Sequence, residues 1–151
     1  MHAITISKPS LAWTLCSKAS ELSQILGYHQ LPPSTRSTSN EDIDPTQFLF
    51  WAIFIIDKIL SLRLGRPATI QNWDITTPMI SLHSTRSPLG ATISVWIDTA
   101  RCQGDVYQSL YSPEALAQPD HVRQSRVETL ASQLRDISLK SREIDVRTHA
   151  C

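Results

Sequence analysis

The chain has 151 residues, 41% of them hydrophobic, and its 14 Lys and Arg balance 14 Asp and Glu. This length suits one domain with a single core. A net charge of zero and a pI near 7.0 argue against a nucleic-acid surface, which usually carries excess positive charge. The N-terminus lacks the basic start and apolar core of a secretory signal, and the longest apolar run is too short to cross a membrane. We therefore expect a reducing, intracellular compartment.

The first predicted helix runs from about Leu11 to Leu26. Apolar residues recur on one face at helical spacing, and Gly27 follows where a left-handed C-terminal cap is expected. The apolar positions are Leu11, Leu15, Ala19, Leu22 and Leu26. The polar stretch HQLPPSTRSTSNED, with two prolines and no periodicity, predicts a surface loop after this helix.

The second predicted helix has the clearest start in the chain. Asp44 suits the N-cap, Pro45 the first helical position, and Gln47 the reciprocal partner of a capping box. Ile43 and Phe48 have the spacing of a hydrophobic staple across this start. These signals predict a helix that begins at Pro45.

The body of this helix is apolar on all sides from Phe48 to Ile56, which predicts a buried central element. It stops at Gly65-Arg66-Pro67. Gly65 can adopt the positive φ that ends a helix, and Pro67 cannot continue one. Residues 68–88 are expected to be irregular chain packed by four apolar side chains. These are Ile70, Trp73, Ile75 and Met79.

A third helix is predicted from Ser87-Pro88 to about Tyr111. Ser112 is the expected N-cap of a short turn that opens at Pro113. A fourth helix is predicted from about Asp120 to Leu139, followed by a charged tail. The fold class is therefore all-α: an irregular multi-helix bundle or array joined by Pro/Ser-rich loops.

Asp57 lies on an apolar face of the central helix, so its carboxylate should be paired or hydrogen-bonded. Ser61 and Arg66 are the candidate partners, and the alternative is a frayed helix end with Asp57 in water. The four tryptophans are expected in the core, the alternative being an aromatic ligand pocket. They are Trp13, Trp51, Trp73 and Trp96.

No catalytic pattern is present in the sequence. The five histidines show no metal-ligand spacing, and no H-E-x-x-H, Walker loop, G-x-G-x-x-G or G-x-S-x-G motif occurs. The three cysteines are Cys16, Cys102 and Cys151, too far apart for a zinc knuckle. We therefore expect no catalytic, cofactor-binding or metal-binding residue, although catalysis by residues distant in sequence stays open.

The segment FLFWAIFIIDKILSLRLGRPATIQNWDI resembles the signature segment of the fungal-specific transcription factor domain, the helical middle region of fungal zinc-cluster regulators. A second similarity, LAWTLCSKASELSQILGYHQ, lies upstream and departs from the family pattern at Ser20 and Tyr28. The signature residues, to which the resemblance gives structural roles, are Trp51, Asp57, Gly65, Arg66, Pro67 and Asp74.

The resemblance implies a partial domain at residues 11–139, with an N-terminal segment at 1–10 and a charged tail at 140–151. Relative to the family, this chain lacks helices expected on both sides and the six-cysteine zinc cluster. We therefore expect neither zinc nor sequence-specific DNA binding by this chain, although the family binds DNA. The implied function is the regulatory portion of a nuclear transcription factor. Its expected partners are other segments of the factor, co-regulators or a second copy, and no membrane. The alternatives are a truncated or scaffold product without regulatory activity and, less favoured, a small-molecule enzyme.

Overall fold

The computed structural model describes residues 8–30, 44–80 and 88–149, and within these ranges the chain is all-α, as the sequence predicts. Short turns η1 (Tyr28–Gln30), η2 (Asn72–Asp74) and the π-helical η3 (Tyr107–Tyr111) connect the longer elements. The α-helices are α2 (Pro9–Ile25), α3 (Pro45–Leu64), α4 (Pro88–Val106), α5 (Pro113–Leu116) and α6 (Asp120–His149).

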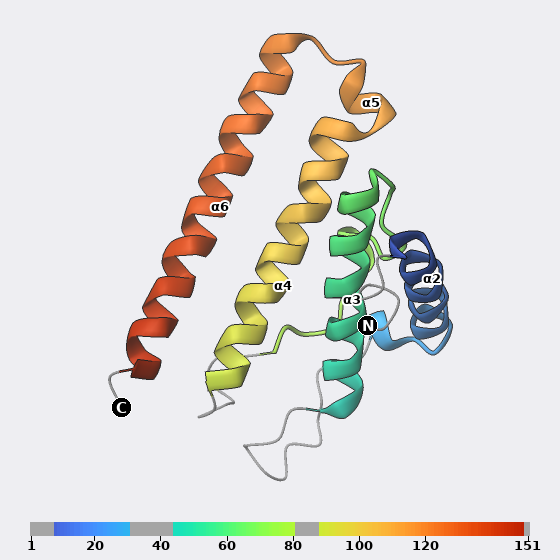
Figure 1. Cartoon of the computed structure of the whole chain (residues 1–151), viewed down its shortest axis with the longest axis vertical. Coiled ribbons are helices and arrows are strands. Elements are labelled where there is room, and N and C mark those ends of the chain that lie inside the picture. Colours follow the sequence, from blue (N-terminus) through green and yellow to red (C-terminus); the bar gives the residue numbers. More distant parts are fainter. Residues whose placement is uncertain (1–7, 31–43, 81–87, 150–151) are drawn as a thin grey trace.

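The four long helices lie side by side (Figure 1). α4 is between α6 and α3, and α2 packs on the other side of α3. α3 and α4 run in the same direction, whereas α6 runs back along α4. Because α3 and α4 run in the same direction, the chain must travel back along the whole length of α3 before α4 begins. A helix rises about 1.5 Å per residue, so this is a long return. Residues 66–80, here called the return segment, make the described part of that return.

The start of α3 is largely as predicted. Pro45 is its first residue, and the Asp44 carboxylate accepts the backbone N–H of Thr46 at 2.9 Å. Gln47 does not complete a capping box, because its amide instead donates to the Pro78 carbonyl at 2.6 Å. The predicted staple involves Ile43, which lies outside the described residues.

α3 is the central element of the core, as its apolar run predicts. Phe50, Trp51 and Phe54 have no exposed surface, and Trp51 meets the other two rings edge-on at centroid distances of 5.1 and 5.4 Å. The return segment and α4 complete this cluster with smaller apolar side chains. They are Ile70, Ile80, Ile93, Ile97 and Ala100.

The prediction of four core tryptophans is wrong for two of them. Trp51 is fully buried and Trp13 partly buried, but Trp73 is 74% exposed and Trp96 54% exposed. Trp73 belongs to the short turn η2, where Asn72 takes the inward position and donates to the Arg101 carbonyl at 3.3 Å. With Asn72 bonded to α4, Trp73 lies on the solvent side of the turn.

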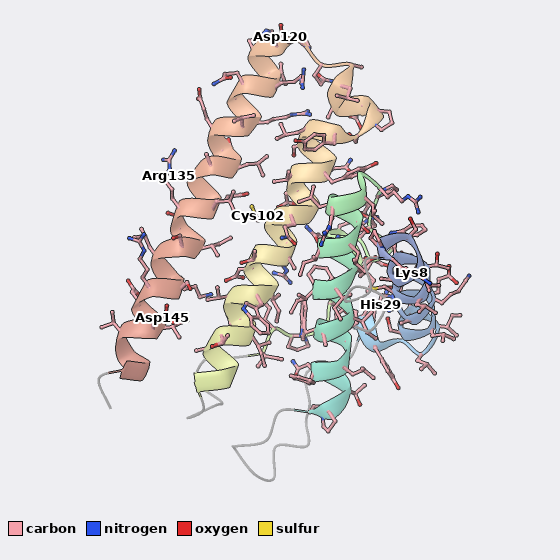
Figure 2. All side chains as sticks on the ribbon, in the orientation of Figure 1. Lys8, His29, Cys102, Asp120, Arg135 and Asp145 are labelled. Atoms are coloured by element: carbon pink, nitrogen blue, oxygen red, sulfur yellow. The ribbon has the colours of Figure 1, made fainter. Side chains whose placement is uncertain are left out.

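α6 continues to His149, whereas the sequence prediction ended this helix near Leu139. Lys140, in the supposed tail, donates to Asp98 of α4 at 2.5 Å and to Ser94 at 3.3 Å. Cys102, labelled in Figure 2, lies on the face of α4 toward α6. Lys140 therefore belongs to the helix that packs on α4 and not to a separate tail.

Candidate functional site

Two neighbouring residues of α3 hold the backbone of the return segment. The Asp57 carboxylate accepts the N–H of Thr69 at 3.2 Å and that of Ile70 at 2.9 Å. The Lys58 ammonium donates to the Ile70 carbonyl at 2.6 Å. Asp57 and Lys58 have 0% and 2% exposed surface, so both charges are inside the protein. Together they satisfy both backbone groups of Ile70.

Burial shifts the protonation of both groups toward the neutral form. It raises the pKa of the Asp57 carboxyl, while the amides of Ile70 and Thr69 and the charge of Lys58 oppose the rise. It lowers the pKa of the Lys58 ammonium, while the carboxylates of Asp57 and Asp105 oppose that fall. Each charge is therefore supported by its hydrogen bonds and by its neighbour, which is the condition for keeping it buried.

The predicted pairing of Asp57 with Arg66 or Ser61 is wrong. Arg66 is exposed, and its guanidinium carbon lies 4.5 Å from the centre of the Trp13 ring on α2. The Ser61 hydroxyl accepts the indole N–H of Trp13 at 3.3 Å. The reason is geometric. The return segment brings the backbone amides of Thr69 and Ile70 to Asp57, so the carboxylate is satisfied without burying the Arg66 side chain.

The glycine at the end of α3 is as predicted. Gly65 has φ of 63° and ψ of 35°, the left-handed conformation that ends helices. Its N–H donates to the Leu62 carbonyl at 3.1 Å, and the Arg66 N–H donates to the Ser61 carbonyl at 2.9 Å. These two bonds form a Schellman motif. The turn aims Arg66 at Trp13 and sends the chain back along α3.

Two other signature residues, Trp51 and Asp74, also attach elements to one another. The Trp51 indole N–H donates to the Pro78 carbonyl at 3.0 Å, at the far end of the return segment. Asp74 lies 3.7 Å from the Nε2 atom of His29 in η1. Pro67 is exposed and follows the Schellman turn. The signature is therefore a set of attachments between α3, the return segment and the α2–η1 region.

The sequence prediction for Asp57 includes neither Lys58 nor Trp13, although both take part in these attachments. A usable signal was present for Lys58, because two opposite charges side by side in an otherwise apolar helix need partners. None existed for the Pro78 carbonyl, since a backbone acceptor leaves no mark in the sequence.

The outer face of α2 is a second notable feature, because it is apolar and uncovered. Five large side chains on α2 and the residue after it are between 49% and 78% exposed. They are Leu11, Leu15, Leu22, Ile25 and Leu26. The inner face, toward α3, instead buries small residues such as Ala12, Ser20 and Ser23. The predicted stripe exists, and it points away from the other helices that the structure describes.

Residues 1–89 match the model of the fungal specific transcription factor domain. The chain belongs to this family. The matched region contains α2, α3 and the return segment, and it ends as α4 begins. The segment that carries the signature attachments is therefore the segment that carries the family.

The curated relatives are much longer than this chain. An uncharacterized transcriptional regulatory protein of Schizosaccharomyces pombe is 27% identical over 123 residues, which is 74% of this chain and 16% of the relative. A second from the same yeast is 28% identical over 82 residues, covering 51% of this chain and 13% of the relative. A third is 31% identical over 74 residues, covering 49% of this chain and 11% of the relative. No solved structure matches the chain.

The described helices offer neither a membrane span nor a clustered metal site. None is both long and apolar enough to cross a bilayer. Among the residues with described placement, His, Cys, Asp and Glu side chains form no group of three or more that could hold an ion.

Proposed function

We propose that this chain is a regulatory portion of a fungal transcription factor that acts in the nucleus through contacts with other protein segments. The family match and the names of the relatives support the regulatory class. The observation that carries the proposal is the outer face of α2. The proposal assigns no catalysis and no cofactor to the chain.

The architecture explains why this face suits a protein partner. α2 rests on α3 through Trp13 and small side chains such as Ala12, so its leucines and Ile25 remain for a second surface. Contiguous apolar patches of this kind usually mark protein–protein contacts. In the yeast relatives the matched region is 16% of the length or less, so such a protein contains ample further chain to cover the face.

DNA contact is not part of the proposed function. The net charge is zero, and Lys18, a cation beside the outer face of α2, is paired with Glu21 at 2.7 Å. Binding that depends on phosphate contacts is therefore expected to be weak and lost with modest salt. A mobility-shift assay that discriminates a defined site from random duplex at physiological salt would contradict this.

A tethering experiment tests the proposed contacts. The chain is fused to a heterologous DNA-binding domain in yeast, and reporter output is compared between the parent and Leu15→Glu/Leu22→Glu. Leu116→Glu on α5 is the matched control, since Leu116 is as exposed as Leu22, at 58%. We expect the α2 variant to change output while helicity by circular dichroism and protein level stay constant. Equal output from parent, variant and control would refute a regulatory contact through α2.

A further inference from the structure

The four long helices lie side by side in a layer (Figure 1), and side chains of three of them hydrogen-bond to the return segment. They are Gln24 of α2, Asp57 of α3 and Asp105 of α4. In α6, Asp136 lines the same small cavity as Asp105. These four residues therefore mark the side of the layer that carries the return segment.

The other side of the layer follows from helix geometry. Nine positions are two and a half turns at 3.6 residues per turn, so side chains nine residues apart point in opposite directions. The residue nine positions before each marker is large, apolar and between 43% and 59% exposed. These residues are Leu15 on α2, Phe48 on α3, Trp96 on α4 and Val127 on α6. One side of the layer, here called the open side, thus carries exposed apolar side chains from all four helices.

The apolar surface of the open side is large enough for a stable interface. Five further large side chains lie whole turns away from the first four, and the nine together are 43–61% exposed. The additional ones are Leu11, Leu22, Leu26, Ile59 and Leu134. Because a half-exposed large side chain presents about 100 Å², the nine present on the order of 900 Å². A standard interface takes about 800 Å² from each partner, whereas the largest apolar patch of an ordinary monomer is about 300–600 Å².

A projection and a hollow lie next to each other on the open side. Trp96 stands at the rim of a groove of about 390 Å³ between α3 and α4. The groove is lined by Ala52, whose small side chain leaves the space open, and by the buried Ile93 and Ala100. Two copies related by a two-fold axis present the same surface to each other. A projection beside a hollow can then fill the hollow of the other copy while its own hollow is filled.

The remaining sequence of this chain supplies too little apolar surface to cover the open side. Outside the described ranges it contains six large apolar residues, in three separate segments. They are Met1, Ile4, Ile6, Leu31, Ile43 and Leu82. A second copy brings nine large exposed side chains of its own. Because the net charge of the chain is zero, two copies do not repel each other through net charge.

We propose that the open side is a face-to-face interface between two copies of this chain, in which Trp96 of each copy occupies the α3–α4 groove of the other. This interface rests on the proposed function in taking the outer face of α2 as a contact surface, and it names a second copy as the partner. Its central contact lies on α3 and α4, so it can be tested without changing α2.

Sedimentation of the full chain over a range of concentrations tests the pairing. We expect the weight-average mass to rise from 16.9 kDa toward that of two chains and no further. Trp96→Ala should raise the dissociation constant about thirtyfold or more, the usual effect of losing a central aromatic contact. Trp73→Ala is the matched control and should leave the constant unchanged, because Trp73 is exposed but belongs to the return segment.

A second pair of variants tests the part of the open side on α6. Leu134→Glu places a charge without a partner in the interface and should weaken pairing about tenfold or more. Leu139→Glu, an exposed position on another face of the same helix, should have no effect. Helicity by circular dichroism should stay constant in both, because neither side chain is buried.

Ala52→Leu tests whether Trp96 enters the groove. It fills the groove and should weaken pairing about tenfold through overpacking. Combined with Trp96→Ala, it should weaken pairing less than the product of the two single effects, since both variants remove the same contact. Effects that simply multiply would mean that Trp96 lies elsewhere, and the proposed pairing would be wrong.

Three further results would overturn the interface. They are a chain that stays monomeric at all concentrations, assembly that continues beyond two chains, and equal effects of a variant and its matched control. A monomer whose reporter output still changes with Leu15→Glu/Leu22→Glu removes this interface and leaves the proposed function. A dimer that Trp96→Ala dissociates, with reporter output that the α2 variant does not change, shows a contact without a regulatory role and removes the proposed function alone.

Discussion

The Asp57 carboxylate accepts the backbone N–H of Ile70 at 2.9 Å, across the gap between the central helix and the chain that returns beside it. Both residues have no exposed surface. Because Lys58 takes the Ile70 carbonyl at 2.6 Å, an acid and a base adjacent in sequence fix the two sides of one peptide segment. Asp57, one of the residues that carry the resemblance, thus has a structural role in attaching the return segment to α3.

The first prediction concerns the coupling of Asp57 and Lys58. Asp57→Ala leaves the amides of Thr69 and Ile70 without an acceptor and Lys58 without its neighbouring charge, so we expect a loss of about 3–5 kcal/mol in unfolding free energy. The double variant Asp57→Ala/Lys58→Met should lose less than the sum of the singles, by about 0.5–3 kcal/mol. Urea unfolding followed by circular dichroism measures this.

Arg63→Ala, an exposed position on the same helix, is the control and should stay within about 0.5 kcal/mol of the parent. Strict additivity of the two core substitutions would mean that the buried charges do not act together.

The second prediction concerns Arg66, which stacks on Trp13 and does not reach Asp57. Arg66→Ala should cost only about 0.5–1 kcal/mol, the size of an exposed cation–π contact. Trp13→Ala should cost more, because it also removes the hydrogen bond to Ser61. Asp57→Ala and Arg66→Ala should add within about 0.3–0.5 kcal/mol, since they share no partner. A coupling well above that value in a double-mutant cycle would restore the direct pairing that the sequence suggested.

The helix framework could be predicted from the sequence because its signals are local. Asp44-Pro45, Gly65 and Ser112-Pro113 each act through backbone groups within a few residues, and each begins or ends a helix as predicted. The Asp57 partners could not be predicted in this way. They are backbone amides twelve and thirteen residues away, and any residue type supplies an amide.

Burial was harder to predict than helix position. Apolar periodicity identifies the stripe of α2 but does not say whether this chain covers it. Trp73 and Trp96 have core-forming chemistry, yet one lies on a short turn and the other on the rim of a groove. Residue type sets what a side chain would gain from burial, and the arrangement of the helices decides whether burial is available.

The third prediction compares Gly65, at the end of α3, with Gly104 of α4, which lies against Lys58. A Cβ at Gly65 meets nothing within 4 Å, so Gly65→Ala should lose about 1 kcal/mol or more from backbone strain alone. A Cβ at Gly104 would meet Lys58 at 3.1 Å from its Nζ atom. Alanine normally stabilises a helix interior by about 0.5–1 kcal/mol over glycine. Because Ile70 holds Lys58 in place, we expect Gly104→Ala to destabilise instead. A rise in thermal stability for Gly104→Ala would show that Lys58 moves aside freely.

The fourth prediction concerns Cys16, which packs beside Leu60 and Ala12. Burial, with a smaller effect from the Asp57 charge, raises the pKa of the Cys16 thiol from 9.0 to about 11. At pH 8 the thiolate fraction should fall about a hundredfold against an unperturbed thiol, so alkylation of Cys16 should be slow in the folded chain and fast in urea. Peptide mapping by mass spectrometry reads this position separately from the other cysteines.

The sign of the accompanying pH effect follows from the same shift. The folded state keeps the Cys16 proton where the unfolded state loses it, so this thiol's contribution to stability is complete below pH 9 and declines between pH 9.0 and about 11. Cys16→Ser should flatten that part of the stability profile. An unchanged slope would mean that the thiol is solvated.

The last prediction concerns the outer face of α2 in solution. With Leu11, Leu15, Leu22, Ile25 and Leu26 all at least 49% exposed, the isolated chain should self-associate or precipitate as its concentration rises. Leu15→Lys/Leu22→Lys should lower the weight-average mass in sedimentation and raise solubility, with little change in unfolding free energy because neither side chain is buried. Ser20→Leu, on the inner face, should do the opposite, since overpacking a fully buried contact between α2 and α3 costs about 1–3 kcal/mol. A monodisperse parent at high concentration would show that this face needs no partner, and the proposed contacts would lose their main support.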